Sequence, residues 1–201
     1  MNLPKAGDIQ RFHDEYVVDR ARAGSERPLN LHGLWRWIEV NHHCNCLLWE
    51  QEDQARRTDV PEAAIAGNKR TIDRHNQSRN DAIEKIDESL LESFAGVAKR
   101  SDARLNSETA GAIVDRLSIL SLKIHHMRLQ TERTDVGQEH VEACRAKLVR
   151  MIEQRNDLIG CLDRLLAECA GGSAYFKVYR QFKMYNDPNL NPYLYKTDRW
   201  S

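Results

Sequence analysis

The chain has 201 residues, 41% of them hydrophobic, enough to bury the core of one domain of ordinary size. Its 30 basic and 30 acidic residues cancel, so no net charge attracts it to nucleic acid or to an anionic membrane. It shows no long apolar run and no signal peptide, and its five cysteines lack the spacing of a disulfide framework. We therefore expect a cytoplasmic protein that binds neither nucleic acid nor membranes.

The distribution of proline and charge predicts an all-α fold. None of the five prolines lies between residues 62 and 187, which is typical of long helices. A first helix is predicted over roughly residues 5–22 and a second over about 31–57, with a break at Gly24–Pro28. Asp59 and Pro61 predict the start of a third helix that runs to about residue 99.

Two further helices follow. Ser107 is the predicted N-cap of the fourth, and a fifth is predicted over roughly residues 135–169, ending before Gly171 and Gly172. The fourth helix carries an apolar seam with 4-3-4-3 spacing, which suits a helical bundle and is compatible with a homodimer. The seam consists of Ile113, Leu117, Leu120, Ile124 and Met127.

Eight of the fourteen aromatic residues lie between Tyr175 and Trp200. Because disordered tails are poor in aromatics, we expect this segment to pack on the bundle, first as a short helix and then as an extended cap after Pro188. The predicted organisation is one domain: an N-terminal helix and loop (1–29), a core of four to five long helices (30–170) and a C-terminal cap (171–201).

The most informative stretch lies in the third predicted helix, from Lys69 to Asp87. At 100° per residue its short polar side chains form a stripe beside an apolar one, where a surface helix would carry Lys and Glu. Such a stripe is typical of a lined pocket, and equally of a buried polar network. Its members are Lys69, Asp73, Asn76, Asn80, Glu84 and Asp87.

Four motifs carry a family resemblance. They are LWxxEDxAR from Leu48, KRxIDxxNQxRNDxIExID from Lys69, DRLSILSLKIHHM from Asp115, and QFKMYNDPNLNPYLY from Gln181. Together they resemble the bacterial domain-of-unknown-function family four-two-five-four (DUF4254). The resemblance covers most of the chain beyond residue 30 and implies no assigned activity.

The preferred interpretation is a groove between the second and third helices. A hairpin that turns near Asp59 places Trp49 opposite Lys69 and Asn45 opposite Asp73. An aromatic ring with amides and carboxylates suits a sugar, a nucleotide or another polar, perhaps phosphorylated, metabolite. The candidate ligand-binding residues are Asn45, Trp49, Asp53, Lys69, Asp73, Asn76, Asn80, Glu84, Asp115, Arg116, Lys183 and Asn186. Among them Lys69, Asp73 and Glu84 are the candidates for acid–base catalysis.

A second interpretation is a Mg²⁺-dependent hydrolase. Helical nucleotide pyrophosphohydrolases of the MazG type hold magnesium between paired acidic motifs, and Lys69 or Arg79 could assist on phosphate. The acidic candidates here are Glu50, Asp53, Asp81, Glu84 and Asp87. A turn near Asp59 places Glu84 about 28 Å along the helix axis from Asp53, at ~1.5 Å per residue, so the two groups meet only if the chain turns at Gly67–Asn68.

A third interpretation is a non-catalytic interaction or scaffold protein. Long packed helices use buried amides and carboxylates to fix their register, and the stripe would then be a structural hydrogen-bond network.

Overall fold

A computed structural model of the chain describes residues 3–23, 31–181, 184 and 187–195. The predicted break at Gly24–Pro28 and the candidate ligand residues Lys183 and Asn186 lie outside these residues. The elements, in chain order, are α1 (Ala6–Ala23), α2 (Gly33–Gln54), α3 (Glu62–Ser93), β1 (Arg104–Leu105), α4 (Ala110–Thr131), α5 (Gln138–Ala170), β2 (Ala174–Tyr175) and α6 (Pro192–Tyr195). The all-α prediction is confirmed.

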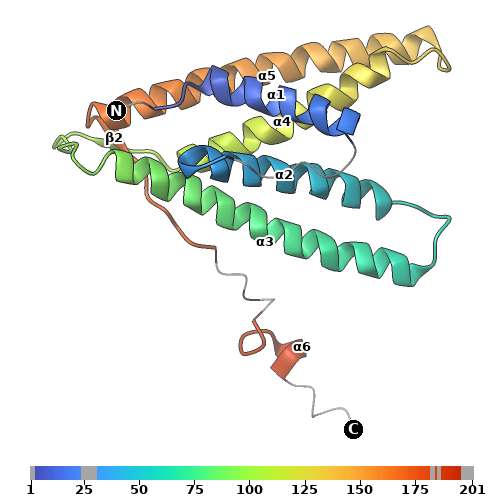
Figure 1. Cartoon of the computed structure of the whole chain (residues 1–201), viewed down its shortest axis with the longest axis horizontal. Helices are drawn as coiled ribbons and strands as arrows, with labels where there is room; N and C mark the ends of the chain where they lie inside the picture. Colours follow the sequence, from blue (N-terminus) through green and yellow to red (C-terminus); the bar gives the residue numbers. More distant parts are fainter. Residues whose placement is uncertain (1–2, 24–30, 182–183, 185–186, 196–201) are drawn as a thin grey trace.

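The long helices form two hairpins (Figure 1). One hairpin is α2 and α3, the other is α4 and α5, and α4 also packs against α2 and α3. Helix α1 lies along α4 and touches α5 and α2. The two short strands pair in parallel and tie the loop after α3 to the segment after α5.

The apolar core lies where all five long helices meet. Each contributes a side chain that is almost completely removed from solvent, and such burial is the main stabilising contribution to a fold of this kind. These side chains include Ile9, Ile38, Ile86, Leu90, Leu117 and Leu162.

Two helix starts differ from their predictions only in detail. The chain turns between α2 and α3 over residues 55–61, which confirms the turn near Asp59, and Pro61 is the N-cap of α3. The predicted N-cap Ser107 is wrong: Thr109 caps α4 and its hydroxyl accepts a hydrogen bond from the Ala112 amide at 3.2 Å. A threonine side chain two residues further on satisfies the free amide of the first turn equally well.

The end of α5 is fixed by glycine, as predicted. Gly172 has a φ of 72°, a conformation that side chains with a Cβ rarely adopt, and its amide bonds to the Cys169 carbonyl. A Cβ at Gly172 would also lie 2.3 Å from the carbonyl oxygen of Ala98. Glycine is therefore required here both by the helix end and by the close approach of the loop after α3.

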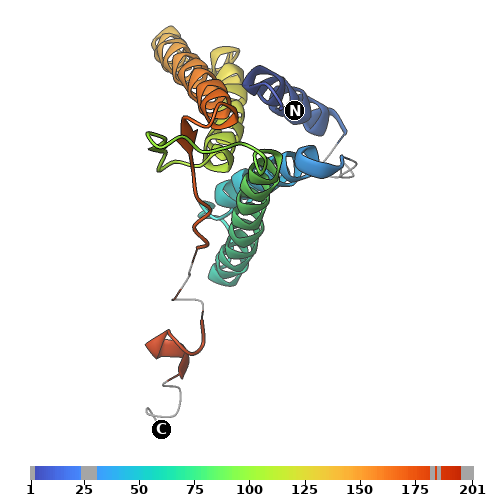
Figure 2. The same cartoon turned by 90° about the vertical axis from the view of Figure 1, so that its left-hand side faces the viewer.

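The C-terminal segment packs on the bundle in its first part only. Ala174 and Phe176 are buried, whereas Leu190 and Tyr193 are 49% and 90% exposed. In Figures 1 and 2 the described part of this segment leaves the helices and carries α6 away from them. The predicted order is also wrong: residues 176–181 form no helix, and the short helix α6 comes later. They follow directly on β2, whose pairing with β1 fixes the start of the segment as a strand, a pairing that a helix could not make.

Among the residues that the structure describes, no helix is long and apolar enough to cross a membrane.

Candidate functional site

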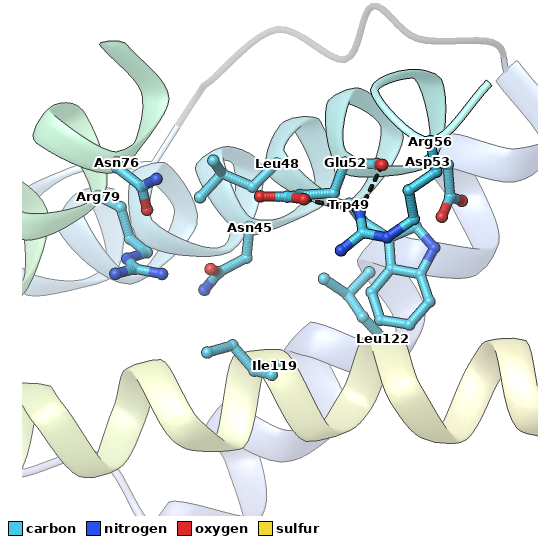
Figure 3. Close-up of a pocket in the computed structure, with 10 residues that line it drawn as sticks. All are labelled: Asn45, Leu48, Trp49, Glu52, Asp53, Arg56, Asn76, Arg79, Ile119 and Leu122. Carbon is cyan, nitrogen blue, oxygen red and sulfur yellow. Dashed lines mark hydrogen bonds and ion pairs between the residues drawn. The ribbon is translucent and has the colours of Figure 1, made fainter. Parts of the chain in front are cut away.

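Helices α2, α3 and α4 enclose a groove of about 320 Å³, called the Trp49 groove below (Figure 3). Helix α2 and the turn after it supply one wall, α3 supplies Asn76 and Arg79, and α4 supplies two apolar side chains. The lining residues are Asn45, Leu48, Trp49, Glu52, Asp53, Arg56, Asn76, Arg79, Ile119 and Leu122. Four of the predicted ligand residues, Asn45, Trp49, Asp53 and Asn76, are thus brought together.

Arg79 is the unusual side chain of this groove. It is about one quarter exposed, and its Nε lies 3.9 Å from Oδ1 of Asp115, too far for a hydrogen bond. Nε itself is buried, and the guanidinium makes no hydrogen bond with any residue in the described part of the chain. A half-buried guanidinium normally spends its five donors on partners. The groove therefore holds a cation with unused hydrogen-bonding capacity.

The other charged groups of the groove lie around the Trp49 ring. In Figure 3, Arg56 extends over this ring toward Glu52, and Asp53 lies beyond it, at the far end from Arg79. Arg56 donates to Oε2 of Glu52 at 2.7 Å, so this pair is mutually neutralised at the surface. Asp53 is exposed and adds a carboxylate beside the ring.

Trp49 separates the groove from a second cavity of about 300 Å³. Its ring stacks on that of His126 with 4.4 Å between centroids and 3° between planes. Trp49, Asp53 and Leu122 line both cavities. Burial, and then the neighbouring His125, lower the pKa of His126, which holds its ring neutral at pH 7.

A hydrogen-bonded cluster of buried side chains, called the buried polar layer below, lies next to the groove between α2 and α4. Oδ1 of Asp115 accepts hydrogen bonds from Nδ2 of Asn41 and of Asn45, each at 2.9 Å. Asn45 also donates to Oγ of Ser118 at 2.8 Å, and Nδ1 of His42 lies 2.7 Å from the same oxygen. All five residues are buried. Two predicted ligand residues, Asn45 and Asp115, therefore take part in packing.

A histidine pair extends this layer toward α1. The rings of His13 and His42 stack at 4.4 Å and both are completely buried. Neither nitrogen of His13 has a hydrogen-bond partner in the described part of the protein. Burial, followed by the nearby His42 and the Arg155 cation, holds the pKa of His13 well below its usual 6.5. His13 is therefore a neutral core residue at physiological pH.

The C-terminal half of the α3 stripe lines a different cavity, of about 230 Å³, which we call the strap cavity. Residues 176–181, called the strap below, cover it together with the start of α4. Its lining residues are Asn80, Ile83, Glu84, Asp87, Ser107, Glu108, Thr109, Ala112, Val178, Tyr179 and Gln181. Asn80 and Glu84, which were predicted to share a site with Trp49, are instead separated from it.

The strap is attached to α3 by polar contacts. Nδ2 of Asn80 donates to Oε1 of Gln181 at 2.8 Å, and the Gln181 amide donates to Oε1 of Glu84 at 3.3 Å. Arg180 pairs with Glu88 at 3.2 Å. These contacts place the strap along the polar stripe of α3.

Asp87 is almost completely buried at the floor of this cavity. Its Oδ1 accepts a hydrogen bond from the Gly111 amide at 2.6 Å, in the first turn of α4. Burial raises the pKa of this carboxyl to about 6, against the opposing effect of hydrogen bonds from Thr109 and Gly111. Asp87 thus joins α3 to the start of α4.

The remaining predicted site residues lie outside both cavities. Lys69 and Asp73 form an exposed ion pair of 2.7 Å within α3, and Arg116 pairs with Glu108 at 2.7 Å on the surface. The structure therefore does not bring the catalytic candidates Lys69, Asp73 and Glu84 together.

The acidic candidates for magnesium are also dispersed. Glu50 pairs with Arg20 at 2.9 Å, and Asp81 accepts a hydrogen bond from Gln77 on the exposed side of α3. No group of three or more His, Cys, Asp or Glu side chains converges within the described residues. The turn at residues 55–61 is the one that keeps Asp53 and Glu84 apart.

Sequence reasoning missed three charged contributors to the groove. Arg79 was considered only as an aid to magnesium chemistry, although it lies three residues after Asn76 and hence on the same side of α3. Glu52 and Arg56 lie on the same side of α2 as Trp49 by the same rule. The His126 stack on Trp49 had no sequence signal, because it depends on how α4 crosses α2.

The comparisons with known proteins identify relatives only. A family model described as "Protein of unknown function (DUF4254)" matches residues 35–178, which include the whole Trp49 groove. No curated protein and no solved structure matches the chain.

Proposed function

The chain belongs to the DUF4254 family, and we propose that its Trp49 groove binds a small metabolite in which an anionic group, such as a phosphate, is joined to a sugar-like part. The observation that carries this proposal is Arg79, a half-buried guanidinium without a hydrogen bond to the described residues.

The anionic group is assigned to Arg79 by charge and geometry. Asp115 is its nearest carboxylate, but Oδ1 of Asp115 lies 3.9 Å away and already accepts two amide hydrogen bonds. A guanidinium presents parallel N–H groups that match two oxygens of a phosphate or carboxylate. A ligand anion would satisfy these donors in a position partly shielded from water.

The polar, ring-shaped part is assigned to the middle of the groove. Trp49 offers an apolar ring, on which sugar rings pack, and Asn76 offers an amide that both donates and accepts hydrogen bonds. Asp53 at the far end adds a carboxylate that accepts hydrogen bonds from hydroxyl groups. Phosphorylated sugars are metabolites of the cytoplasm, so the proposal includes a cytoplasmic location.

Melting temperatures with a ligand panel test this proposal. Glucose 6-phosphate and glucose 1-phosphate are expected to raise the melting temperature, with smaller shifts from inorganic phosphate and from glucose. A ligand at 100 times its Kd adds about 2.7 kcal/mol to the free energy of unfolding. Each added kcal/mol raises the melting temperature by about 2 to 4 °C in a chain of this size. The same shifts with and without Mg²⁺ support the groove alone; a shift that requires Mg²⁺ supports the hydrolase alternative.

Arg79→Gln should abolish these shifts, and Arg79→Lys should reduce them, because lysine keeps the charge without the paired donors. The matched control is Arg70→Gln, which makes the same charge change at an exposed position of α3. A flat response to the whole phosphate panel, or equal loss in Arg70→Gln and Arg79→Gln, contradicts the proposal.

A second candidate function is an interaction protein, favoured by the exposed apolar side chains of the C-terminal segment. Leu190, Tyr193, Leu194 and Tyr195, within six residues of one another, are between 46% and 90% exposed, and exposed apolar patches often mark protein–protein contacts. Light scattering of the full chain and of a chain ending at residue 186 tests this. A homodimer that is lost on truncation supports it, and a monomer in both cases argues against self-association.

A further inference from the structure

We propose that the strap cavity is a second binding site, and that it takes a ligand with a primary ammonium group. This inference goes beyond the proposed function, because the strap cavity and the Trp49 groove share no lining residue.

The charges that line the cavity are all negative. Glu84, Asp87 and Glu108 contribute carboxylates, and none of its lining residues is a lysine, arginine or histidine. Arg116 and Arg180 lie nearby, but each is paired with a glutamate, Glu108 and Glu88 respectively. The cavity therefore favours a cation and disfavours the phosphate that suits Arg79.

The lining also has more hydrogen-bond acceptors than donors. Oε1 of Glu84 accepts from the strap and Oε1 of Glu108 accepts from Arg116, which leaves the second oxygen of each carboxylate without a hydrogen-bond partner among the described residues. A carboxylate can accept several hydrogen bonds and donates none. An ammonium group carries three donors and no acceptor, which is the complementary set.

Asn80 supplies an independent observation. Its side chain is only 6% exposed and lines the cavity, and its Oδ1 accepts no hydrogen bond from the described residues. Its Nδ2 is already used on Gln181 of the strap. A buried carbonyl oxygen that the protein does not satisfy is uncommon and normally accepts a hydrogen bond from a water or a ligand. A ligand that meets Oδ1 of Asn80 must therefore bring a donor.

The cavity has a size that selects small amines. Its volume of about 230 Å³ lies below the ~300 to 1,000 Å³ typical of drug-sized ligands. Because the strap crosses it with Tyr179 and Gln181, a ligand enters beside the strap or displaces it. Aliphatic diamines and small amino alcohols fit these limits.

Asp87 adds a dependence on pH. Burial raises the pKa of its carboxyl to about 6 in the free protein. A cation bound nearby stabilises the ionised carboxylate, so binding below pH 6 must release a proton and becomes weaker. An amine that binds here is therefore expected to bind more tightly at pH 7.5 than at pH 5.5.

Calorimetry with 1,4-diaminobutane tests the proposal, at constant ionic strength. The uncharged matched compound is 1,4-butanediol, which has the same chain with hydroxyl ends. We expect the diamine to bind at least tenfold more tightly than the diol at pH 7.5. Equal affinities, or no heat from the diamine, overturn the proposal.

Variants locate the binding. Glu84→Gln removes one charge and keeps an acceptor for the strap, and it should weaken the diamine by about tenfold or more. Glu92→Gln makes the same change at an exposed position two turns further along α3 and should leave the affinity within twofold. Equal loss in both variants would show general surface attraction and overturn the site. Arg79→Gln should leave diamine binding unchanged, which separates this test from that of the Trp49 groove.

One further variant tests whether the strap cavity takes an external amine or an ammonium group of the protein's own chain. Lys183 follows the strap by two residues and carries a primary ammonium group. If Lys183→Met leaves the melting temperature and the diamine affinity unchanged, the site takes an external amine. If it lowers the melting temperature and strengthens diamine binding, the occupant is Lys183 and the proposal of an external ligand fails.

Discussion

The buried polar layer and the Trp49 groove lie side by side on α2, but they treat polar groups in opposite ways. In the layer, Asp115 accepts hydrogen bonds from both Asn41 and Asn45 and so joins α2 to α4, although Oδ1 of Asn41 itself accepts no hydrogen bond from the described residues. In the groove, Arg79 comes within 3.9 Å of the same carboxylate and makes no hydrogen bond with the described residues. Polar residues at a buried helix face thus serve packing where hydrogen bonds join them to the neighbouring helix, and a charged side chain without such bonds is available for a ligand.

The difference follows from side-chain length and from what each side chain faces. Asparagine, aspartate and serine are short, and between α2 and α4 they reach one another directly. Arginine on α3 is longer and borders a cavity of about 320 Å³, so its end is left in open space. If this comparison is correct, substitutions in the layer should change stability strongly, and substitutions in the groove should change it little.

The largest effect on stability is expected for Asp115→Ala. The change leaves the Asn41 amide without its acceptor and should lower the free energy of unfolding by about 3 kcal/mol, because a buried donor without a partner keeps its full desolvation penalty. Urea denaturation measures this. The control is Asp73→Ala, whose exposed ion pair with Lys69 should be worth less than about 1 kcal/mol. Similar losses in both variants would show that the buried hydrogen bonds to Asp115 stabilise the fold no more than an exposed ion pair does.

The next effect is expected for Gly111→Ala, at the other closely packed contact of α4. A Cβ there would lie 2.5 Å from the Ile83 carbonyl oxygen and 2.9 Å from Oδ1 of Asp87, so α3 and α4 must separate. We expect a loss of about 2 kcal/mol, as for other overpacked sites.

Gly160→Ala is the matched control for this change. A Cβ at Gly160 meets nothing within 4 Å, and alanine should raise stability by up to about 1 kcal/mol through helix propensity. Thermal denaturation of the two variants should therefore give shifts of opposite sign. A stabilised Gly111→Ala protein would show that α3 and α4 are not closely packed at this point.

A moderate effect is expected in the pH dependence of stability. The pKa of His13 is lowered in the folded state, so below pH 6.5 the unfolded chain binds a proton that the folded chain does not. Unfolding free energy then falls with falling pH, by up to about 1.4 kcal/mol per unit. Asp87 acts in the opposite sense: its pKa is raised from 3.8 to about 6, so its contribution favours folding as pH falls from 6 toward 3.8.

His13→Phe separates these two contributions. An aromatic ring is kept and the titrating group is removed, so the decrease in unfolding free energy between pH 6.5 and pH 5 should become smaller by up to about 1.4 kcal/mol per pH unit, the contribution of one proton. Urea denaturation across this range measures the slope. An unchanged slope would show that His13 is not the buried group that resists protonation.

The smallest effect on stability is expected for Arg79→Gln. Because Arg79 contributes only a long ion pair, the free energy of unfolding should change by less than about 1 kcal/mol, and it can increase, since binding sites are not optimised for stability. Urea denaturation measures the free energy of unfolding of this variant, and the ligand panel measures its loss of binding. A loss as large as that of Asp115→Ala would place Arg79 in the structural layer and remove the main support for the groove.

Much of the fold was predictable because helix signals are local. The absence of proline between residues 62 and 187, the start at Pro61 and the glycines after α5 set the helices and the turn near residue 59. That turn also placed Asn45 and Trp49 opposite the start of the α3 stripe. The cap of α4 was misplaced because Ser107 and Thr109 are both good caps, and packing of Asp87 on the first turn favours the second.

The sequence by itself determined that α3 carries a stripe of short polar residues, because helical periodicity alone aligns them. Only the tertiary structure decided what each part of the stripe faces. Lys69 and Asp73 extend to solvent, Asn76 meets α2 and α4, and Asn80 and Glu84 meet the strap, a segment about 100 residues away. A stripe about 27 Å long, at ~1.5 Å per residue, is too long for one neighbour to cover, so its chemistry depends on which segments pack beside it.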